Sequence, residues 1–511
     1  MLILAISQLS TKEIAGILKV PEGTVRHRLF GGRKQIKKWR NRDMTDERLE
    51  RLLTQNKIQQ HKVAGRNTND LTNGNLPVQI LFFSLPLMAS NMLQVLFNMA
   101  DVAVVGRFAG PMALGAVGST TTLVALYTGL LIGLSSGINV LVALTVGARH
   151  VKDTEETVHT ALIISGIAGI FLMLVGVGST GTVLVLLHTK AELIQGAARY
   201  LHIYLLGLPA LAVYNFGNAV LSAAGDTKRP LLYLSVSGVM NVILNLFFVI
   251  ACHMDVEGVA VASILSQYTS AILILRHLFG CGEIYGLKRD KVRMSRDKAV
   301  RLLQLGVPSG LQNGIFYLAN LFVQMGVNSF DATVVAGNAA AANADNLVYD
   351  MMAAFYTACG SFMGQNYGAK KWKRVVRSYF ISMFYAFACG LVLGLGLVTA
   401  GRHFLGLFTA EEAVMEAGME RLTIMGLSYC VSAFMDCSIA AARSLGKSFV
   451  PMVIVIFGAC VFRVTWIYTV FAYFRTTMSL YLLFVCSWVI TAITGNLYLL
   501  WTYRSVRRVS R

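Results

Sequence analysis

Charged residues are scarce in this sequence, and their scarcity excludes an ordinary soluble protein. Only 14% of the 511 residues are charged, whereas 55% are hydrophobic and the mean hydropathy is +0.59. Soluble domains carry about 25% charged residues. The composition therefore indicates a polytopic membrane protein. Apolar stretches of about 20 or more residues, enough to cross a bilayer, occur near 78–105, 113–146, 157–187, 197–224, 230–251 and 256–279, and again near 303–328, 333–366, 375–400, 415–442, 450–473 and 478–502.

The sequence also lacks the motifs of catalytic and nucleotide-dependent proteins. It contains no phosphate-binding loop, no nucleotide fingerprint and no nucleophile motif. Its eight cysteines have no metal-ligand spacing, and most of them fall within apolar stretches. We therefore expect no enzyme activity, no cofactor and no metal site, and we expect any transport to be driven by an ion gradient.

A faint internal repeat is the most informative positive feature. Landmark residues in the two halves differ in residue number by a nearly constant 221 or 222: Pro86 with Pro308, Gly147 with Gly368, Gly225 with Gly446, and Pro230 with Pro451. Membrane transporters use such duplicated halves to build a site between them. The sequence thus predicts an all-α polytopic membrane protein with twelve transmembrane helices in two pseudo-symmetric six-helix lobes, at 77–280 and 301–505. Six spans in each half predict a pseudo-two-fold axis along the membrane normal.

Lys and Arg are distributed asymmetrically between alternate loops. The rich loops contain Arg149 and Lys152, Lys228 and Arg229, the cluster from Lys288 to Lys298, the cluster from Lys370 to Arg377, and the basic tail 506–511. By the positive-inside rule these loops are cytoplasmic. We therefore expect a multi-pass protein of the bacterial cytoplasmic membrane with both termini and the 281–300 linker in the cytoplasm. The net charge of +19 then reflects topology and not nucleic-acid binding.

The segment 1–76 has a different character. In residues 1–40 two short helices are expected around the turn Val20-Pro21-Glu22-Gly23, and the passages EIAGIL and PEGTVRHRL resemble the helix-turn-helix of sigma-factor region 4. Gly31 and Gly32 interrupt the second helix, and the upstream helices of that domain are missing. We expect a vestigial fragment that does not bind nucleic acid, followed by a polar tether at 41–76.

Polar side chains enter the predicted spans along stripes. On the first span Asn91, Gln94, Asn98 and Asp101 lie on one helical face, and on the seventh span Asn313, Tyr317, Asn320 and Gln324 do so. The offset of 222 relates Asn91 to Asn313 and Asn98 to Asn320. These stripes are candidates for a shared substrate cavity. Alternatively, they form interhelical hydrogen bonds worth about 0.6 to 2 kcal/mol each.

Further polar groups lie on later spans. Asn241 and Asn245 share one face of the fifth span, and Ser263 lies on the sixth; oxygen-bearing groups near a carboxylate could coordinate Na⁺ or relay H⁺. We interpret Asp345, Asp350, Asp436 and Arg463 as the intramembrane charges of the second half. Arg463 either has a role in function or simply neutralises the charge of one of these acids.

Three passages, LFNMADVAVVGRFAGPMALGAVG, MNVILNLFFVIACHMDVEGVAVASILSQ and VVAGNAAAANADNLVYDMMAAFYTACGSFMGQNYGAKK, resemble the multidrug and toxic compound extrusion (MATE) family. The likeness covers roughly residues 72–505. It implies twelve helices in two lobes and export of organic cations or other amphipathic compounds in exchange for H⁺ or Na⁺. The family's first-lobe cation site has an Asp that matches Asp101, and its hydroxyl matches Ser263.

The sequence departs from the family pattern at two places. The family's Asn-x-x-x-Asp pair reads Asn241-x-x-x-Asn245 here, and the lost carboxylate favours H⁺ over Na⁺. Some members bind a cation through a Glu on the seventh helix, but there is no acid between 303 and 330, so that site is not carried over.

Three hypotheses for function remain. The first is a cation-coupled exporter of a small cationic or amphipathic molecule, and the second is a flippase for lipid-linked precursors, which the wider superfamily also contains. A flippase should have a basic central cavity for a pyrophosphate, whereas the stripes are rich in amides and nearly free of Lys and Arg. The third is a membrane-tethered transcription regulator, which depends on residues 5–40 alone. The sequence does not specify an oligomeric state.

Overall fold

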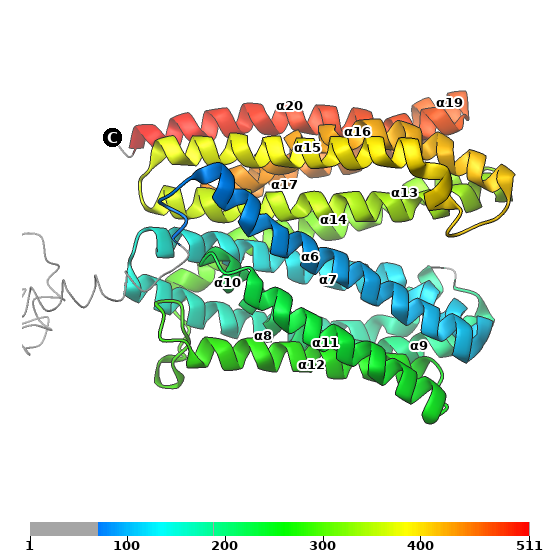
Figure 1. Cartoon of the computed structure of the whole chain (residues 1–511), viewed down its shortest axis with the longest axis horizontal. Coiled ribbons are helices and arrows are strands. Elements are labelled where there is room, and N and C mark those ends of the chain that lie inside the picture. Colours follow the sequence, from blue (N-terminus) through cyan, green and yellow to red (C-terminus); the bar gives the residue numbers. More distant parts are fainter. Residues whose placement is uncertain (1–69, 188, 510–511) are drawn as a thin grey trace, which may run out of the picture. The chain divides into compact units, whose positions relative to one another are not determined.

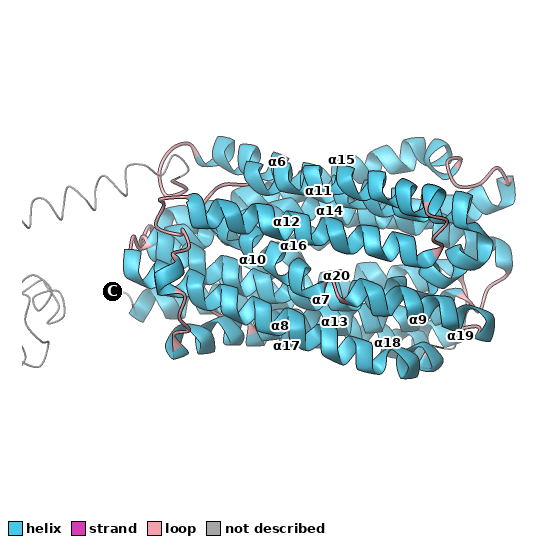
Figure 2. Cartoon of the chain, turned by 90° about the horizontal axis from the view of Figure 1, so that it is seen from below, coloured by secondary structure: helices cyan, strands magenta, loops and turns pink. Residues whose placement is uncertain are grey.

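The computed structural model describes residues 70–187 and 189–509, and every regular element in these ranges is helical (Figures 1 and 2). The expected helix-turn-helix fragment and all but the end of the expected tether lie outside the described residues. The elements keep the labels of Figure 1, in which the first described helix is α6.

The first half contains six spans, of which the fourth is broken. The helices are α6 (Leu76–Val104), which continues into the π-helical segment η1 (Val105–Ala109), α7 (Gly110–Gly147), α8 (Val151–Leu186), the pair α9 (Ala191–Leu205) and α10 (Leu208–Ala223), α11 (Lys228–Leu246) with the π-helical segment η2 (Phe247–Ala251), and α12 (Val256–Gly280). The axes of α9 and α10 differ by 48°. A short 3₁₀ helix, η3 (Arg289–Lys291), lies in the linker.

The second half repeats this order. Its first four helices are α13 (Arg296–Val327), α14 (Ala332–Gly368), α15 (Trp372–Leu405) and α16 (Glu412–Ser444). The next span is interrupted and consists of α17 (Phe449–Val455), η4 (Ile456–Val461), α18 (Phe462–Trp466), η5 (Ile467–Phe471) and α19 (Ala472–Phe474). The last helix is α20 (Thr477–Val509). In Figure 1 α15, α16 and α20 lie on one side, α8, α11 and α12 lie on the other, and α6 crosses obliquely in front.

Unusual backbone angles repeat with the sequence offset. Among the described residues, the four non-glycine residues with positive φ form two pairs: Arg149 and Lys370, 221 apart, and His253 and Arg475, 222 apart. Gly225 and Gly446, 221 apart, also share a positive φ. Both halves therefore turn in the same way at equivalent loops, as a duplicated fold requires.

Most of the spans are strongly apolar. Among the described residues, eight helical stretches are long and apolar enough to cross a membrane, or nine when the α9 and α10 pair counts as one span. The first stretch, Leu76–Gly147, contains both α6 and α7. Two remaining helices, α13 and α14, are not among these stretches, because α13 carries the polar stripe and α14 carries two aspartates and several asparagines.

Glycines bring the two halves into backbone contact. A Cβ atom at Gly133 of α7 would lie 2.3 Å from the backbone nitrogen of Gly310 in α13, and one at Gly147 would lie 2.0 Å from the carbonyl oxygen of Gln365 in α14. Small residues permit this close approach of helices in a membrane. Asn139 and Ser361, which the repeat offset also relates, donate hydrogen bonds to each other across the same seam, at 3.2 Å.

Candidate functional site

The first lobe places a carboxylate against two amides. Asp101 lies on α6 just before η1, and Asn245 lies on α11 just before η2. The Asn245 Nδ2 group donates hydrogen bonds to Asp101 Oδ1 and, at 3.3 Å, to Asn241 Oδ1. Both asparagines are buried. π-Helical segments inside α-helices occur frequently at functional sites, and here one follows each of the two interacting residues.

One acceptor of this site has no partner. Among the described residues, nothing donates a hydrogen bond to Asn245 Oδ1, although it is buried. Buried polar atoms are nearly always satisfied, so an unpartnered one calls for an explanation. Carboxylate and amide oxygens are the donors that hard cations prefer, and a carboxylate can also take up a proton. The Asp101 and Asn245 oxygens thus offer a small site suited to H⁺ or Na⁺.

The remaining first-lobe candidate is Ser263. Ser263 is buried on α12, and within the described residues its hydroxyl makes no hydrogen bond to Asp101, Asn241 or Asn245. Sequence reasoning missed Tyr200 and Tyr204 of α9, which stack at 5.8 Å between ring centroids and lie within electrostatic range of Asp101. Their i, i+4 spacing was the available signal.

Two equivalent members of the predicted stripes connect the lobes. Asn91 of α6 donates to the carbonyl oxygen of Asp350 in α14 at 2.7 Å, and Asn313 of α13 donates to the carbonyl oxygen of Gly129 in α7 at 3.1 Å. Asn91 and Asn313 therefore form the interhelical hydrogen bonds that the sequence analysis gave as the alternative to a substrate cavity. Gln94 and Asn98 are exposed on α6, and Tyr317 is 37% exposed on α13. Gln324 donates to Asn328, the residue that follows the end of α13.

Two arginines from other helices contact α13, although the stripe itself contains no Lys or Arg. Arg463 is 1% exposed and donates to Asn320 Oδ1 and Ser487 Oγ, each at 3.1 Å. Arg443 of α16, which the sequence analysis did not single out, donates to Gln312 Oε1 at 2.7 Å. Arg443 lies just beyond the end of the predicted tenth span, which is why the sequence did not place it in the membrane.

The other second-lobe acids have different surroundings. Asp345 forms an ion pair with Arg421 and accepts a hydrogen bond from Tyr429, and Arg421 also donates to Asn338. This group connects α14 to α16, although Arg421 Nε has no hydrogen-bond partner among the described residues. Asp436 is in electrostatic range of Arg443 and Arg463, but among the described residues it forms no ion pair. The hydrogen-bond partners of Arg463 among the described residues are likewise neutral.

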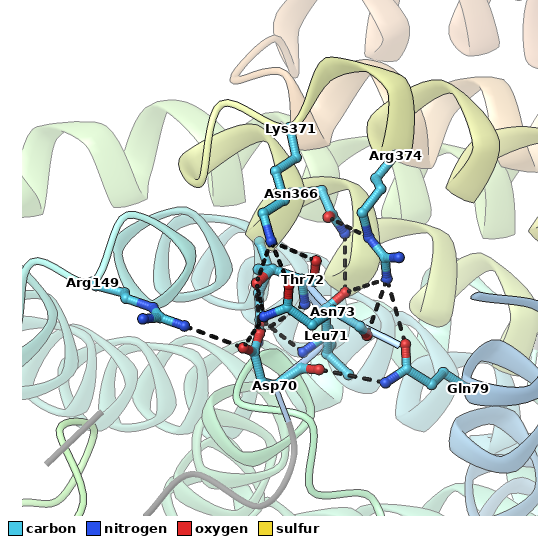
Figure 3. A network of polar contacts seen from close by, with 10 residues as sticks. Asp70, Leu71, Thr72, Asn73, Gln79, Arg149, Asn366, Lys371 and Arg374 are labelled. Atoms are coloured by element: carbon cyan, nitrogen blue, oxygen red, sulfur yellow. Dashed lines mark hydrogen bonds and ion pairs between the residues drawn. The ribbon is translucent and has the colours of Figure 1, made fainter. Parts of the chain in front are cut away.

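The segment before α6 is clasped by both lobes (Figure 3). We call residues 70–74 together with Arg149, Asn366, Lys371 and Arg374 the clasp. Lys371 Nζ donates to the Thr72 carbonyl oxygen at 2.8 Å, Arg374 Nη1 donates to the Gly74 carbonyl oxygen at 2.9 Å, and Asn366 Nδ2 donates to the Leu71 carbonyl oxygen at 3.1 Å. Arg149 of the first lobe lies 3.2 Å from Asp70. The clasp therefore bridges the lobes at the end that carries the basic loops.

The contacts of the clasp favour the ionised form of Asp70. Partial burial opposes its charge, but hydrogen bonds from Thr72 and Asn73 and the charge of Arg149 outweigh burial and hold the pKa of Asp70 below its ordinary value of 3.8.

Comparison with known proteins places these features in a family. The MatE family model matches twice, at residues 86–247 and 308–469, and the two matches are related by the same offset of 222 as the internal repeat. The chain is 29% identical over 372 residues to "Probable multidrug resistance protein YpnP" of Bacillus subtilis (70% of this chain, 80% of the relative), and 21% identical over 351 residues to "FAD transporter" of Shewanella oneidensis (66% and 75%).

Solved structures agree with the fold. A structure titled "Outward-facing conformation of a multidrug resistance MATE family transporter of the MOP superfamily" matches 86% of this chain and 98% of its own with a TM-score of 0.80 and 22% identity. This match confirms the all-α, twelve-helix fold. Because the two family matches cover most of the chain, the protein belongs to the MatE family of membrane transporters and is not an enzyme.

Proposed function

We propose that this chain is a secondary active antiporter that exports organic cations, drugs or amphipathic metabolites in exchange for H⁺ or Na⁺. The observation that carries the proposal is Asp101, a carboxylate at membrane depth that is held by the Asn245 amide beside an unpartnered oxygen. The relatives named as a multidrug resistance protein and an FAD transporter support export of small organic molecules.

The chemistry of this site favours proton coupling. Among the described residues Asp101 has no cationic partner, so its charge depends on what binds it. A carboxylate in a poorly solvated site takes up a cation on one side of the membrane and releases it on the other. Asn245 stands where a second carboxylate would strengthen Na⁺ binding. We therefore favour H⁺ as the coupling ion.

Alternating access would use the seam between the lobes. The clasp and the glycine contacts of α7 with α14 close the end with the basic loops. We place this end, with both termini, on the cytoplasmic side of a bacterial plasma membrane, as the positive-inside rule requires. Loading of a substrate from the cytoplasm then requires the clasp to open.

A second function is favoured by one observation. Arg463, which is buried, and Arg443, whose Nε atom is buried, give the second lobe the positive charge that a flippase would need for a lipid-linked pyrophosphate. Gradient-independent translocation of a pyrophosphate-linked lipid in proteoliposomes would favour this alternative over the antiporter.

The experiment for the antiporter is efflux of a fluorescent cation from proteoliposomes under separately imposed H⁺ and Na⁺ gradients. We expect Asp101→Asn to abolish gradient-driven efflux, because an amide has no titratable group, and we expect Asp436→Asn to retain most of it. Thermal unfolding of each variant controls for misfolding. If Asp101→Asn exports normally and Asp436→Asn does not, coupling resides in the second lobe and the proposal fails.

A further inference from the structure

The second lobe carries a basic counterpart of the Asp101 site. The repeat offset of 222 relates Arg463 to Asn241, and it relates the hydrogen-bond partner of Arg463, Asn320, to Asn98. The starts of α11 and α17 differ by 221, and His253 and Arg475 after these spans differ by 222. The second half has an additional π-helical segment, η4, before Arg463, and such a segment accommodates one more residue. A guanidinium thus occupies the position of a neutral amide.

The Arg463 guanidinium is held rigidly with one edge unused. Its Cζ atom lies 4.8 Å from the ring centroid of Phe316 and 4.7 Å from that of Phe484, while Nε and Nη1 donate to Ser487 and Asn320. Nη2 is buried and has no hydrogen-bond partner among the described residues. Leaving a charged donor unsatisfied in the interior is costly. The unpartnered Nη2 group therefore indicates that a ligand accepts a hydrogen bond from it.

Arg443 presents a second incompletely used guanidinium. Nη2 donates to Gln312 of α13 at 2.7 Å, and Nη1 donates to Ser136 of α7 in the other lobe at 3.4 Å. Nε is buried and has no partner within the described part of the chain. Arg443 thus contacts both α13 of its own lobe and α7 of the other lobe.

The charges of this region do not balance. Asp436 is in electrostatic range of both arginines, and its own Oδ2 is buried without a partner among the described residues. Arg421, by contrast, is already paired with Asp345. Within the described part of the chain, Asp436 is the carboxylate in electrostatic range of both guanidinium groups, and it forms an ion pair with neither. An oxyanion would compensate the remaining positive charge, and guanidinium forks match carboxylate and phosphate geometry.

Two tyrosines connect this region to the protein surface and to the opposite lobe. Tyr349 of α14 is 47% exposed and lies in electrostatic range of Asp436, Asp350, Arg443 and Tyr317. The ring of Tyr317 lies over Gly129 of α7, where an added Cβ would meet it at 2.7 Å. A ligand at the lobe interface can therefore approach these groups.

We propose that Arg443 and Arg463 form an anion-binding subsite for a carboxylate or phosphate group, with Asp436 as the internal counter-ion that compensates them when the subsite is empty. If the subsite binds the transported molecule, then that molecule is an amphiphile with an anionic group. This inference about the substrate rests on the proposed transport function. The binding itself is independent of ion coupling at Asp101.

The test is equilibrium binding of two dyes with the same scaffold, anionic carboxyfluorescein and cationic rhodamine 6G, to the full chain in phosphatidylcholine nanodiscs without any gradient. We expect Arg443→Gln and Arg463→Gln each to weaken carboxyfluorescein binding about tenfold or more, as loss of charged hydrogen bonds predicts, and to leave rhodamine 6G binding within about twofold. Asp436→Asn should strengthen carboxyfluorescein binding. Arg377→Gln, an exposed arginine on the basic-loop end, is the matched control and should change neither dye.

Several outcomes would overturn the subsite. These are no carboxyfluorescein binding by the parent protein, equal loss of both dyes in the arginine variants at unchanged thermal unfolding, or weaker carboxyfluorescein binding by Asp436→Asn. If Arg463→Gln does not fold, Arg443→Gln and Asp436→Asn carry the test. Repeating the titration with phosphatidylglycerol in the nanodiscs identifies the source of the anion: competition indicates a lipid headgroup, and no competition indicates a soluble anion. Asp101→Asn should bind carboxyfluorescein normally, so failure of ion coupling is distinguishable from failure of the subsite.

Discussion

The contact between Gly147 and Gln365 makes a stringent prediction about how the lobes close. An added Cβ at Gly147 would lie 2.0 Å from the Gln365 carbonyl oxygen, whereas ordinary contacts begin at 3.4 Å. Gly147→Ala therefore requires the backbones of α7 and α14 to separate or to strain. Overpacking of this kind costs about 1 to 3 kcal/mol. If separation of the lobes relieves the strain, the same energy shifts their equilibrium toward the open state by about 5- to 150-fold.

The matched control is Gly166→Ala in α8. Gly166 is also a helical glycine, but an added Cβ there would meet no atom within 4 Å. Because alanine is the better helix former, Gly166→Ala should be neutral or stabilise the fold by up to about 1 kcal/mol. The two variants thus make the same chemical change with opposite expected signs.

Two measurements check the prediction. Thermal unfolding of the purified protein should be lowered by Gly147→Ala and not by Gly166→Ala. Disulfide formation between Asn139→Cys and Ser361→Cys, which replace the hydrogen-bonded pair across the seam, should fall in the Gly147→Ala background. Equal stability and equal crosslinking in both alanine variants would refute the view that backbone contact closes this end.

Three further predictions concern other parts of the chain. Asp70→Asn should lower the free energy of unfolding by less than about 1 kcal/mol at pH 7, since the ion pair is exposed. Because the pKa of Asp70 is lowered in the fold, this contribution is present above pH 3.8 and disappears as acid protonates the carboxylate. Unfolding measured at several pH values would check this dependence. Deletion of residues 1–69 should leave efflux unchanged, whereas deletion of 1–75, which also removes the clasp segment, should impair it; equal effects would contradict the role of the clasp. Asp345→Asn should destabilise the protein by about 3 kcal/mol or more in thermal unfolding, because it leaves the buried Arg421 charge uncompensated.

The sequence by itself determined the class of fold, for a physical reason. A span must satisfy its backbone hydrogen bonds internally and expose apolar side chains to lipid, so hydropathy reveals helices almost directly. The repeat was visible because glycines and prolines at equivalent turns face the same backbone constraints, as Gly225 and Gly446 show with their positive φ. The proximity of Asp101 to Asn241 and Asn245 could be anticipated only through the family resemblance, because the carboxylate and the two amides lie on helices far apart in the sequence.

Only the tertiary structure decided which polar residues meet. A stripe on one helix has the same appearance whether it faces a cavity, another helix or an arginine. Asn91 and Asn313 bond to the opposite lobe, while Asn320 binds the guanidinium of Arg463. The partners come from helices that are distant in the sequence, so no local pattern encodes them. The clasp could not be predicted from the sequence either, because its acceptors are backbone carbonyls, which every sequence possesses. Only the fold places these carbonyls against Lys371 and Arg374.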